Sequence, residues 1–586
     1  MDILSTSGIN NLINSYTQNE TSKRVSPINL QKTKYSNLSS AWGTLSSKLS
    51  SLQTIVDELK STTSTSIFNS RSAELSSSDF FSVTTASGAA PSAYSLRVNQ
   101  LAKSDLAVSN TMASDTAVST MSGDHQIKLQ SGDYSSTVDL SLTSSETNSS
   151  VMDAINSAIS DDHAVVESAS LDGATAYTGS GSFDIDVNGT TTTINYDYSS
   201  GYTNSTAIDD LVNQITNNVS GVTAEKVTNG SNVSLKITVD DKSQYITIDS
   251  STDTGTLLNS SNLNINVSKE KAASALANTS VFSPSTGNSK FSISAVESGY
   301  DNRLIMSDVS GSALNFLGLT SSILGAHTVT SSDTTAGFIY DATSSTSNEL
   351  NSILDFNGIT VNRNSNTISD LVSDVTFNLK AEMQATDTTV TATVKNDSTT
   401  TKNKITDFIS KFNDAYTSIK NNYFSSKDGR GIFAGDTTAL SIMNTLRNDV
   451  TSQVSGITSG NLSYFSDIGI TFDPSTGLTL SDSSKLTSAL DSKPDQVAAI
   501  FNSTSGIANN LYNLTDAFTG ADGSIINITN SLDNNISYLN DKITSTNDSI
   551  TKSAENLRKQ YEQMQMQLAT LLQTQQYMST LSGGLF

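Results

Sequence analysis

Two heptad repeats, one at each end of the chain, constrain the fold more than any other feature of the sequence. In such a repeat apolar residues recur every seven positions, so one seam of a helix faces a partner over its whole length. The C-terminal repeat has one apolar column, made of Ile536, Ile543, Ile550, Leu557, Met564, Leu571 and Met578. The N-terminal repeat has two columns, made of Leu38, Leu45, Leu52 and Leu59 and of Trp42, Leu49 and Val56. These patterns predict a long helix at each end, with the two packed as a coiled coil.

The C-terminal repeat has a weaker companion column. Leu532 and Leu539 begin it, but polar residues occupy its next three positions. A seam with polar companions makes a coil that is weak on its own, so we expect this helix to pack fully only inside an assembly. The alternative is that each terminal helix packs on a globular core. Helices of ordinary domains rarely keep a strict period of seven for so long, which favours the coil.

Composition limits what lies between the two helices. The 586 residues are enough for several domains, but the hydrophobic content of 35% and the aromatic content of 6% are low for one large core. Charged residues make up only 15%, so the chain lacks the high charge of many disordered proteins. The polar remainder is rich in Ser, Thr and Asn, which is typical of several small β units with solvated faces.

Charge and cysteine content exclude several kinds of partner and site. The formal net charge of −24, without a basic cluster, argues against nucleic acid and anionic membranes as partners. The absence of cysteine excludes disulfides and cysteine-ligated metal. The stretch from Met1 to Tyr16 lacks the basic and apolar regions of a signal peptide, and no apolar run is long enough to span a bilayer. We therefore expect no membrane insertion, and either a cytosolic protein or one exported without a cleaved signal peptide.

Alternating apolar and polar residues between about 105 and 345 predict β-strands in a repeated arrangement. Each copy consists of a strand pair, a short helix and a second strand pair, and residues 291–311 resemble the end of a partial third copy. The Asn188-Gly189 and Asn229-Gly230 pairs predict tight hairpin turns in the second copy. Outside the repeats, residues 80–103 predict another hairpin, and Asn357-Gly358 marks one more.

Three stretches of the sequence resemble a known family. The first is VTTASGAAPSAYSLRVNQLA, which begins at Val83, and the second is FNGITVNRNSNTISDLVSDVTFNLKAE, which begins at Phe356. The third is a C-terminal block that contains IGITFDPSTGLTLSDSSKL, PDQVAAIF and QYEQMQMQLATLLQTQQYM. In this order they resemble the flagellar filament cap proteins, also called the flagellar hook-associated protein 2 family. The repeats between 105 and 345 resemble the β-rich hook-IN units of flagellins and cap proteins.

The resemblance implies a non-enzymatic assembly chaperone at the distal tip of the bacterial flagellar filament. Such a protein promotes folding and incorporation of exported flagellin and prevents its leakage. The implied partners are further copies of the chain (a pentamer, within a range of four to six), flagellin, hook–filament junction proteins, and a cytosolic export chaperone at the C-terminal helix. The implied location is extracellular, reached by the flagellar type III route.

The family resemblance and the patterns together predict an α+β multidomain fold. Terminal coiled-coil legs would carry an α/β head, and a discontinuous β-rich insertion would form a plate. The predicted limits are 1–40 and 552–586 for a terminal helical region that is mobile alone, 41–104 and 346–551 for the coiled coil and head, 105–181 and 276–345 for the plate domain, and 182–275 for an outer hook-IN-like domain.

The sequence offers no constellation that predicts catalysis or a cofactor. His125, His163 and His327 do not lie at metal-ligand spacing from one another. The glycine-rich run at 429–436 lacks the Lys and Ser/Thr of a phosphate-binding loop, so a plain turn is expected there. We expect no metal, no cofactor and no enzymatic activity. Two other functions stay open at this point: a surface adhesin built on the β repeats, and another axial flagellar protein such as one of the hook–filament junction.

Overall fold

A computed structural model describes residues 5–319, 337–424 and 429–583 of the chain. The fold is α+β and multidomain, with helices towards both ends of the chain and strands between them. Contacts divide the chain into two compact units. A helical unit comprises residues 1–72, 86–91 and 394–586, and a β unit comprises residues 73–85 and 92–393. The four-part division predicted from the sequence stays a prediction.

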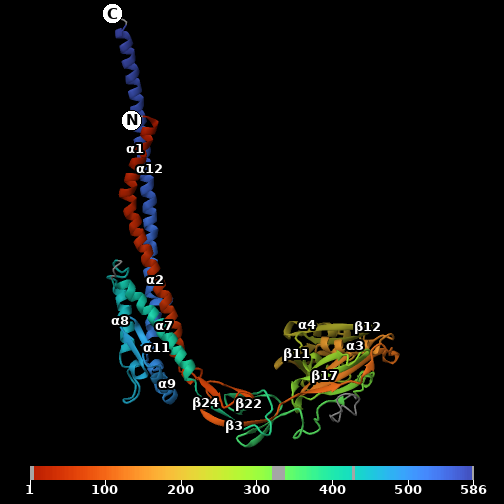
Figure 1. The fold of residues 1–586 in the computed structure, drawn as a ribbon. Helices are drawn as coiled ribbons and strands as arrows, with labels where there is room; N and C mark the ends of the chain where they lie inside the picture. Colours follow the sequence, from red (N-terminus) through yellow and green to blue (C-terminus); the bar gives the residue numbers. More distant parts are fainter. Residues whose placement is uncertain (1–4, 320–336, 425–428, 584–586) are drawn as a thin grey trace. The chain divides into compact units, whose positions relative to one another are not determined.

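The helical unit combines long helices from both ends of the chain with a cluster of shorter ones (Figure 1). At the start, α1 (Thr6–Glu20), a π-helical turn (Thr21–Val25) and α2 (Ser26–Leu59) follow one another without a break. The cluster contains α7 (Ser398–Tyr423), α8 (Thr437–Thr451), α9 (Ser483–Ser492), α10 (Pro494–Asn502), α11 (Ile507–Thr519) and the short strands β25 (Ile470–Asp473) and β26 (Gly477–Leu480). Helix α12 (Ser524–Gly583) completes the unit.

A large apolar core fixes the second half of α2 to the cluster of shorter helices. Trp42 is fully buried, and its ring centroid lies 4.7 Å from that of Phe433. The ring of Phe408 meets Phe465 and Phe501 edge-on, both at 5.9 Å. Burying each large apolar side chain contributes about 1.5–3 kcal/mol. The heptad residues of α2 therefore belong to a globular core as well as to a coil.

The π-helical turn brings α1 into phase with α2. Ile9 and Tyr16 lie seven residues apart on α1, and a further step of seven leads to Lys23. Counting back by sevens from Leu38 on α2 leads instead to Arg24, one residue later. A π turn accommodates one residue more than an α turn. The turn therefore absorbs the extra residue, and both helices present their apolar sides to α12.

The strands of the β unit form five sheets in the part of the chain that the structure describes. The largest sheet has the strand order β11 (Thr190–Asp197), β10 (Ser180–Val187), β14 (Tyr245–Ile248), β15 (Val267–Lys271), β7 (Tyr134–Leu142), β6 (Gly123–Ser131), β18 (Ile305–Ser310). A second sheet has the order β12 (Val222–Asn229), β13 (Asn232–Val239), β8 (Val165–Glu167), with β9 (Leu171–Asp172) also on β13. A third has the order β16 (Ala277–Phe282), β17 (Asn288–Ser298), β4 (Ser104–Val108), β19 (Gly337–Phe338), with β5 (Met112–Ala113) also on β17.

The other two sheets lie nearer the ends of the β unit in sequence. One has the order β1 (Arg71–Leu75), β24 (Val390–Asn396), β3 (Ser92–Gln100), β20 (Ser352–Phe356), β21 (Ile359–Arg363). The other has the order β2 (Phe81–Thr85), β23 (Val375–Leu379), β22 (Thr367–Val372). The hairpin predicted over 80–103 is therefore wrong, because its two strands, β2 and β3, pair in different sheets. Aromatic partners far along the chain prevail over the local turn: Phe81 packs on Phe377, and Tyr94 stacks on Phe356 at 5.5 Å.

The predicted Asn-Gly turns are present, one of them displaced. Asn188 and Asn357 each adopt a left-handed backbone conformation, with φ of 51° and 50°, and each precedes a glycine at the tip of a two-residue hairpin loop. Such a turn matches the twist of the strands it joins. In the third hairpin Asn229 pairs with Asn232, so Gly230 and Ser231 form the tip instead.

The repeated arrangement predicted for the β unit is present in part: two copies share the hairpin and the helix, but a second strand pair, β12 with β13, follows the helix only in the second copy. The predicted partial third copy is wrong, because β18 pairs with β6 of the first copy. The hairpin of β6 and β7 leads into α3 (Asn148–Asp161), and the hairpin of β10 and β11 leads into α4 (Asn204–Asn218). Thr147 and Thr203 begin these helices with the same reciprocal capping box. The side chains of the next residues, Asn148 and Asn204, make matching bonds. Their Nδ2 atoms donate to the backbone carbonyls of Ala113 and Asp172, at 2.8 and 2.9 Å.

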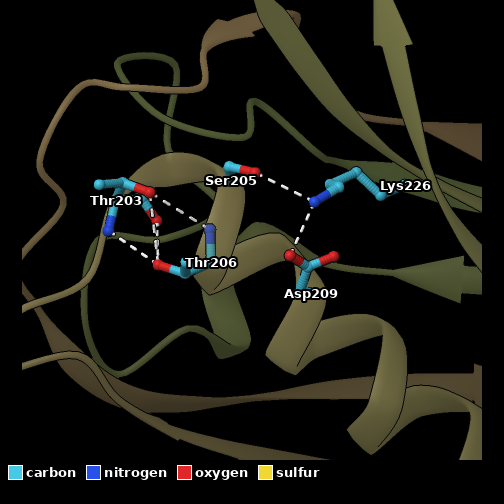
Figure 2. A network of polar contacts seen from close by, with 5 residues as sticks. All are labelled: Thr203, Ser205, Thr206, Asp209 and Lys226. Carbon is cyan, nitrogen blue, oxygen red and sulfur yellow. Dashed lines mark hydrogen bonds and ion pairs between the residues drawn. The ribbon is translucent and has the colours of Figure 1, made fainter.

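Figure 2 shows the cap of α4 in the second copy. The Thr203 backbone N–H donates to the Thr206 hydroxyl at 2.9 Å, and the Thr203 hydroxyl accepts from the Thr206 N–H. Lys226, on β12, adds a link to the helix, because its Nζ lies 3.0 Å from Ser205 Oγ and 2.7 Å from Asp209 Oδ2. This ion pair fixes the first turns of α4 to the sheet beneath it.

The two copies are joined through exchanged strands and buried carboxylates. Strand β8 follows α3 of the first copy but pairs with β13 of the second, and β15 pairs in parallel with β7. Glu270 on β15 accepts bonds from the Ser135 hydroxyl at 2.9 Å and the Thr137 N–H at 2.8 Å. Burial raises the pKa of Glu270 to about 6, against the effect of these bonds. Burial likewise raises the pKa of Asp162, which accepts bonds from Ser136 and Ala273.

Candidate assembly surface

Helix α12 packs antiparallel along α2 and α1. Ser39 on α2 donates to Asp533 at 3.1 Å, and at the other end of the pair Arg558 donates to Asn10 at 2.7 Å. Residue numbers thus rise along one helix as they fall along the other. Figure 1 shows α12 running beside α2 and α1 and continuing past the start of α1.

The N-terminal heptad residues are almost all buried in the core of the helical unit. Leu38 is half-buried, and the other six have no exposed surface: Trp42, Leu45, Leu49, Leu52, Val56 and Leu59. Their neighbours in the core come from the shorter helices and from Ile525 and Leu532 of α12. The structure therefore brings these residues together, against the cluster of shorter helices as well as against α12.

The C-terminal column divides into a packed and an exposed part. Ile550 is buried, and Ile536, Ile543 and Leu557 are half-buried along the seam. Leu557 packs with Ala554 against Ile9 and Ile13 of α1. Three members of the column lie in the open and are 43–66% exposed: Met564, Leu571 and Met578. The column is therefore one seam only as far as α1 reaches.

We call residues 562–583 of α12 the distal segment and residues 524–561 the proximal segment. The distal segment exposes four large apolar side chains outside the predicted column: Met566, Leu568, Leu572 and Tyr577, which are 41–67% exposed. Leu568 and Leu572 lie on the same helix face as the three exposed column members, because steps of three, four or seven residues return to nearly the same side of an α-helix. After Glu562 the distal segment contains no charged residue, a signal that is readable in the sequence. A contiguous apolar stripe of this kind marks a surface for a partner.

The described residues contain no group of three or more His, Cys, Asp or Glu side chains placed to hold a metal ion. His125 is buried on β6, where one ring nitrogen lies 2.9 Å from the Met121 carbonyl and the other accepts the Ser312 N–H at 3.1 Å. His163 lies near the surface beside the Asp161 carbonyl, and His327 lies outside the described residues. Among the helices that the structure describes, none combines the length and the apolar character needed to cross a bilayer.

Comparison with known proteins places this architecture in a family. The family model of the flagellar hook-associated protein 2 N-terminus matches residues 5–105 of the sequence. The family model of the C-terminus of the same protein matches residues 350–572. Together the two matches account for more than half of the chain. They include α1, α2 and most of α12, and they leave out the two β repeats.

Curated relatives of the chain bear the same family name. Flagellar hook-associated protein 2 of Salmonella typhimurium is 33% identical over 172 residues, which are 26% of this chain and 34% of that protein. The B-type flagellar hook-associated protein 2 of Pseudomonas aeruginosa is 25% identical over 179 residues, which are 30% of this chain and 37% of that protein. The chain thus aligns with about a third of the length of each relative. The crystal structure of three domains of the flagellar cap protein FliD from Escherichia coli covers 84% of this chain and 99% of that one, at 20% identity and a TM-score of 0.45.

The matched models occur in the expected order, the two terminal segments lie side by side in one helical unit, and both curated relatives bear the same family name. The chain belongs to the flagellar hook-associated protein 2 family.

Proposed function

We propose that this protein caps the distal tip of the bacterial flagellar filament. There it promotes the folding and incorporation of exported flagellin and prevents flagellin from leaking into the medium, without catalysing a reaction. The single observation that carries the proposal is the distal segment, a nearly uncharged helix whose apolar stripe is left uncovered by the described residues of its own chain, in a member of this family. Such a helix is suited to pack with the helices of other subunits.

The different burial of the two segments of α12 suggests a different role for each. The proximal segment is held by α2 and α1 of its own chain, so it orients the leg. The apolar stripe of the distal segment is available to helices of other subunits. Such helices can pack against it with side chains at intervals of three and four residues as anchors. We propose filament and hook–filament junction subunits as these partners. Because the stripe is narrow, the contact is reversible, as a cap that moves with the growing tip requires.

We further propose that the chain acts as a homo-oligomer, a pentamer within a range of four to six subunits. The β unit would form the plate and outer domain of the cap. Before export through the flagellar type III route, a cytosolic chaperone would cover the C-terminal helix. Covering is needed in the cytosol because an uncovered apolar stripe promotes aggregation.

The proposal is tested with a strain that lacks the gene. We expect bare hooks on the cells and unpolymerised flagellin in the culture medium, and restoration of filaments by the wild-type gene. Normal filaments and a medium free of flagellin in the deletion strain would contradict the cap function.

A further inference from the structure

A hollow of about 630 Å³ opens on the helical unit between α2 and the loop before α8. Leu30 and Leu38 from α2 and Ile432 from the loop supply its apolar lining, and Thr33 and Asn37 from α2 add uncharged polar groups. Leu30 is 72% exposed and Ile432 is 37% exposed, so both present apolar surface to solvent. The hollow lies within the volume range of sites that take a side chain or small ligand.

Two cations border this hollow and suggest what it accepts. Lys34 lines it from α2, and Arg430 lines it from the loop, where its Nη2 donates to the Ala434 carbonyl at 3.2 Å. Apolar walls with cations at the border suit an aromatic side chain, whose ring buries apolar area while its face attracts a cation. Tyrosine is the residue type that combines such a ring with a hydroxyl that can stay in water.

The helical unit carries a tyrosine of this kind on its surface. Tyr538, on the proximal segment, is 62% exposed and lies outside the seam between α12 and α2. Asp541 is three residues further on the same side of the helix and is also exposed, so a carboxylate accompanies the ring. The described residues that line the hollow do not include Tyr538 of the same chain.

The antiparallel register places Tyr538 and the hollow at the same height on the leg. Ser39 and Asp533 contact each other directly across the two helices, at 3.1 Å. Lys34 precedes Ser39 by five residues, and Tyr538 follows Asp533 by five residues. Because each α-helix rises by the same amount per residue, Lys34 and Tyr538 lie level along the helix pair, on two different helices.

This height match bears on how copies of the chain would associate. A contact between two different surfaces of identical chains is heterologous, and it closes into a ring only when it involves rotation without a shift along the axis. A protrusion and a hollow at the same height are compatible with that condition when the helix pair runs along the ring axis. Docking of the distal segment into the same hollow would not, because Met564 lies about 40 Å further along α12 than Tyr538.

We propose that Tyr538 of one copy inserts between Leu30 and Ile432 of the next copy, beside Lys34 and Arg430, and that this contact repeats around a closed ring of legs. The inference deepens the proposed function, since it rests on the chain acting as a homo-oligomer. Tyrosine buried between apolar walls is a frequent centre of binding energy at interfaces. The charge of Asp541 complements the two cations of the hollow.

The absence of cysteine from the chain makes the contact directly testable. Full-length Tyr538→Cys and Ile432→Cys proteins are mixed under mild oxidation, and disulfide-linked heterodimers are identified by mass spectrometry. The matched control replaces Tyr538→Cys by Ile526→Cys, because Ile526 is 38% exposed on the same helix but lies several turns before Tyr538. We expect at least tenfold more heterodimer with Tyr538→Cys than with the control. A single chain that carries both Tyr538→Cys and Ile432→Cys should form a series of disulfide-linked oligomers that ends in closed rings. Equal yields, or a predominance of like-with-like dimers, would overturn the proposal.

A second measurement does not depend on cysteine chemistry. We expect Tyr538→Ala to weaken association of the full chain at least tenfold in sedimentation experiments, and Tyr538→Phe to preserve most of it. Association of Tyr538→Ala equal to that of the wild type would overturn the assigned surface. Normal rings without the expected cross-link would overturn the surface alone and leave the cap function standing, whereas a chain that stays monomeric would overturn both the surface and the proposed oligomer.

Discussion

The proximal and distal segments of α12 belong to one unbroken helix and carry the same seven-residue column, yet among the described residues only the proximal segment finds packing partners within its own chain. Ile550 is 1% exposed and Leu571 is 66% exposed, although both occupy the same column position. The difference arises from the partner, because α1 begins at Thr6 and its Ile9 already packs beside Leu557 and Tyr561. A heptad pattern thus specifies which face of a helix is meant to be covered, and the length of the partner decides where the covering comes from the same chain.

The largest expected effect comes from a substitution in the buried core of the helical unit, where α2 packs. Leu49→Ala removes a fully buried side chain, so it should lower the free energy of unfolding of the helical unit by about 2–5 kcal/mol. Trp42 is the single tryptophan of the chain, so its fluorescence during urea unfolding reports on this unit alone. A loss below about 0.5 kcal/mol, which is the range of surface substitutions, would contradict the observed packing of α2.

The next effect concerns the phase between α1 and α2. Deleting Ser22 alone converts the π turn to a regular helix and should keep Ile9 and Ile13 on α12. Deleting both Ser22 and Lys23 rotates α1 by a further angle of about 100°, since each residue turns the helix by that angle. We expect the amides of residues 6–20 to lose their hydrogen-exchange protection in the double deletion only. Equal protection in the two deletions would show that the seam does not hold α1.

A smaller effect is expected within the distal segment. Ala569→Gly lowers helix stability by about 1 kcal/mol, which should speed amide exchange of neighbouring residues about fivefold. Because the distal segment has no partner within the described part of its chain, the change should not alter the urea concentration at the midpoint of unfolding, followed by Trp42 fluorescence. A displaced transition would mean that the distal segment packs within its own chain after all.

The smallest expected effect is that of Leu571→Ala on the isolated chain. Leu571 is mostly exposed, so its truncation should change the free energy of unfolding by less than about 0.5 kcal/mol. Urea unfolding followed by Trp42 fluorescence provides the comparison with Leu49→Ala under identical conditions. A loss comparable to that of Leu49→Ala would remove the distinction between the two segments.

Much of the fold was predictable because its signals are local. The column from Leu38 to Leu59 predicted α2, the column from Ile536 to Met578 predicted α12, and the Asn188-Gly189 pair predicted a turn that the structure contains. The hairpin over 80–103 was wrong because Phe81 and Tyr94 find aromatic partners in a distant part of the sequence, a long-range preference that no local pattern reveals.

The candidate surface was predictable only in part, for a related reason. The sequence identified Met564, Leu571 and Met578 as seam residues, but it did not distinguish them from Ile550, because burial depends on how far α1 reaches along α12. The hollow beside Leu30 and Ile432 brings together residues that lie far apart in the sequence, so it could not be predicted from spacing. The role of the seam residues in capping stays a prediction.

The most direct test of the account is complementation of the deletion strain with Leu571→Glu, which places a charge in the centre of the distal stripe. The matched control is Gln573→Glu, which adds the same charge on the opposite side of the same helix. The account predicts that the Leu571→Glu protein unfolds at the wild-type urea concentration, yet flagellin accumulates in the medium as it does without the gene, whereas Gln573→Glu restores filaments. Normal filaments with Leu571→Glu would contradict the claim that the distal segment works by packing against other subunits.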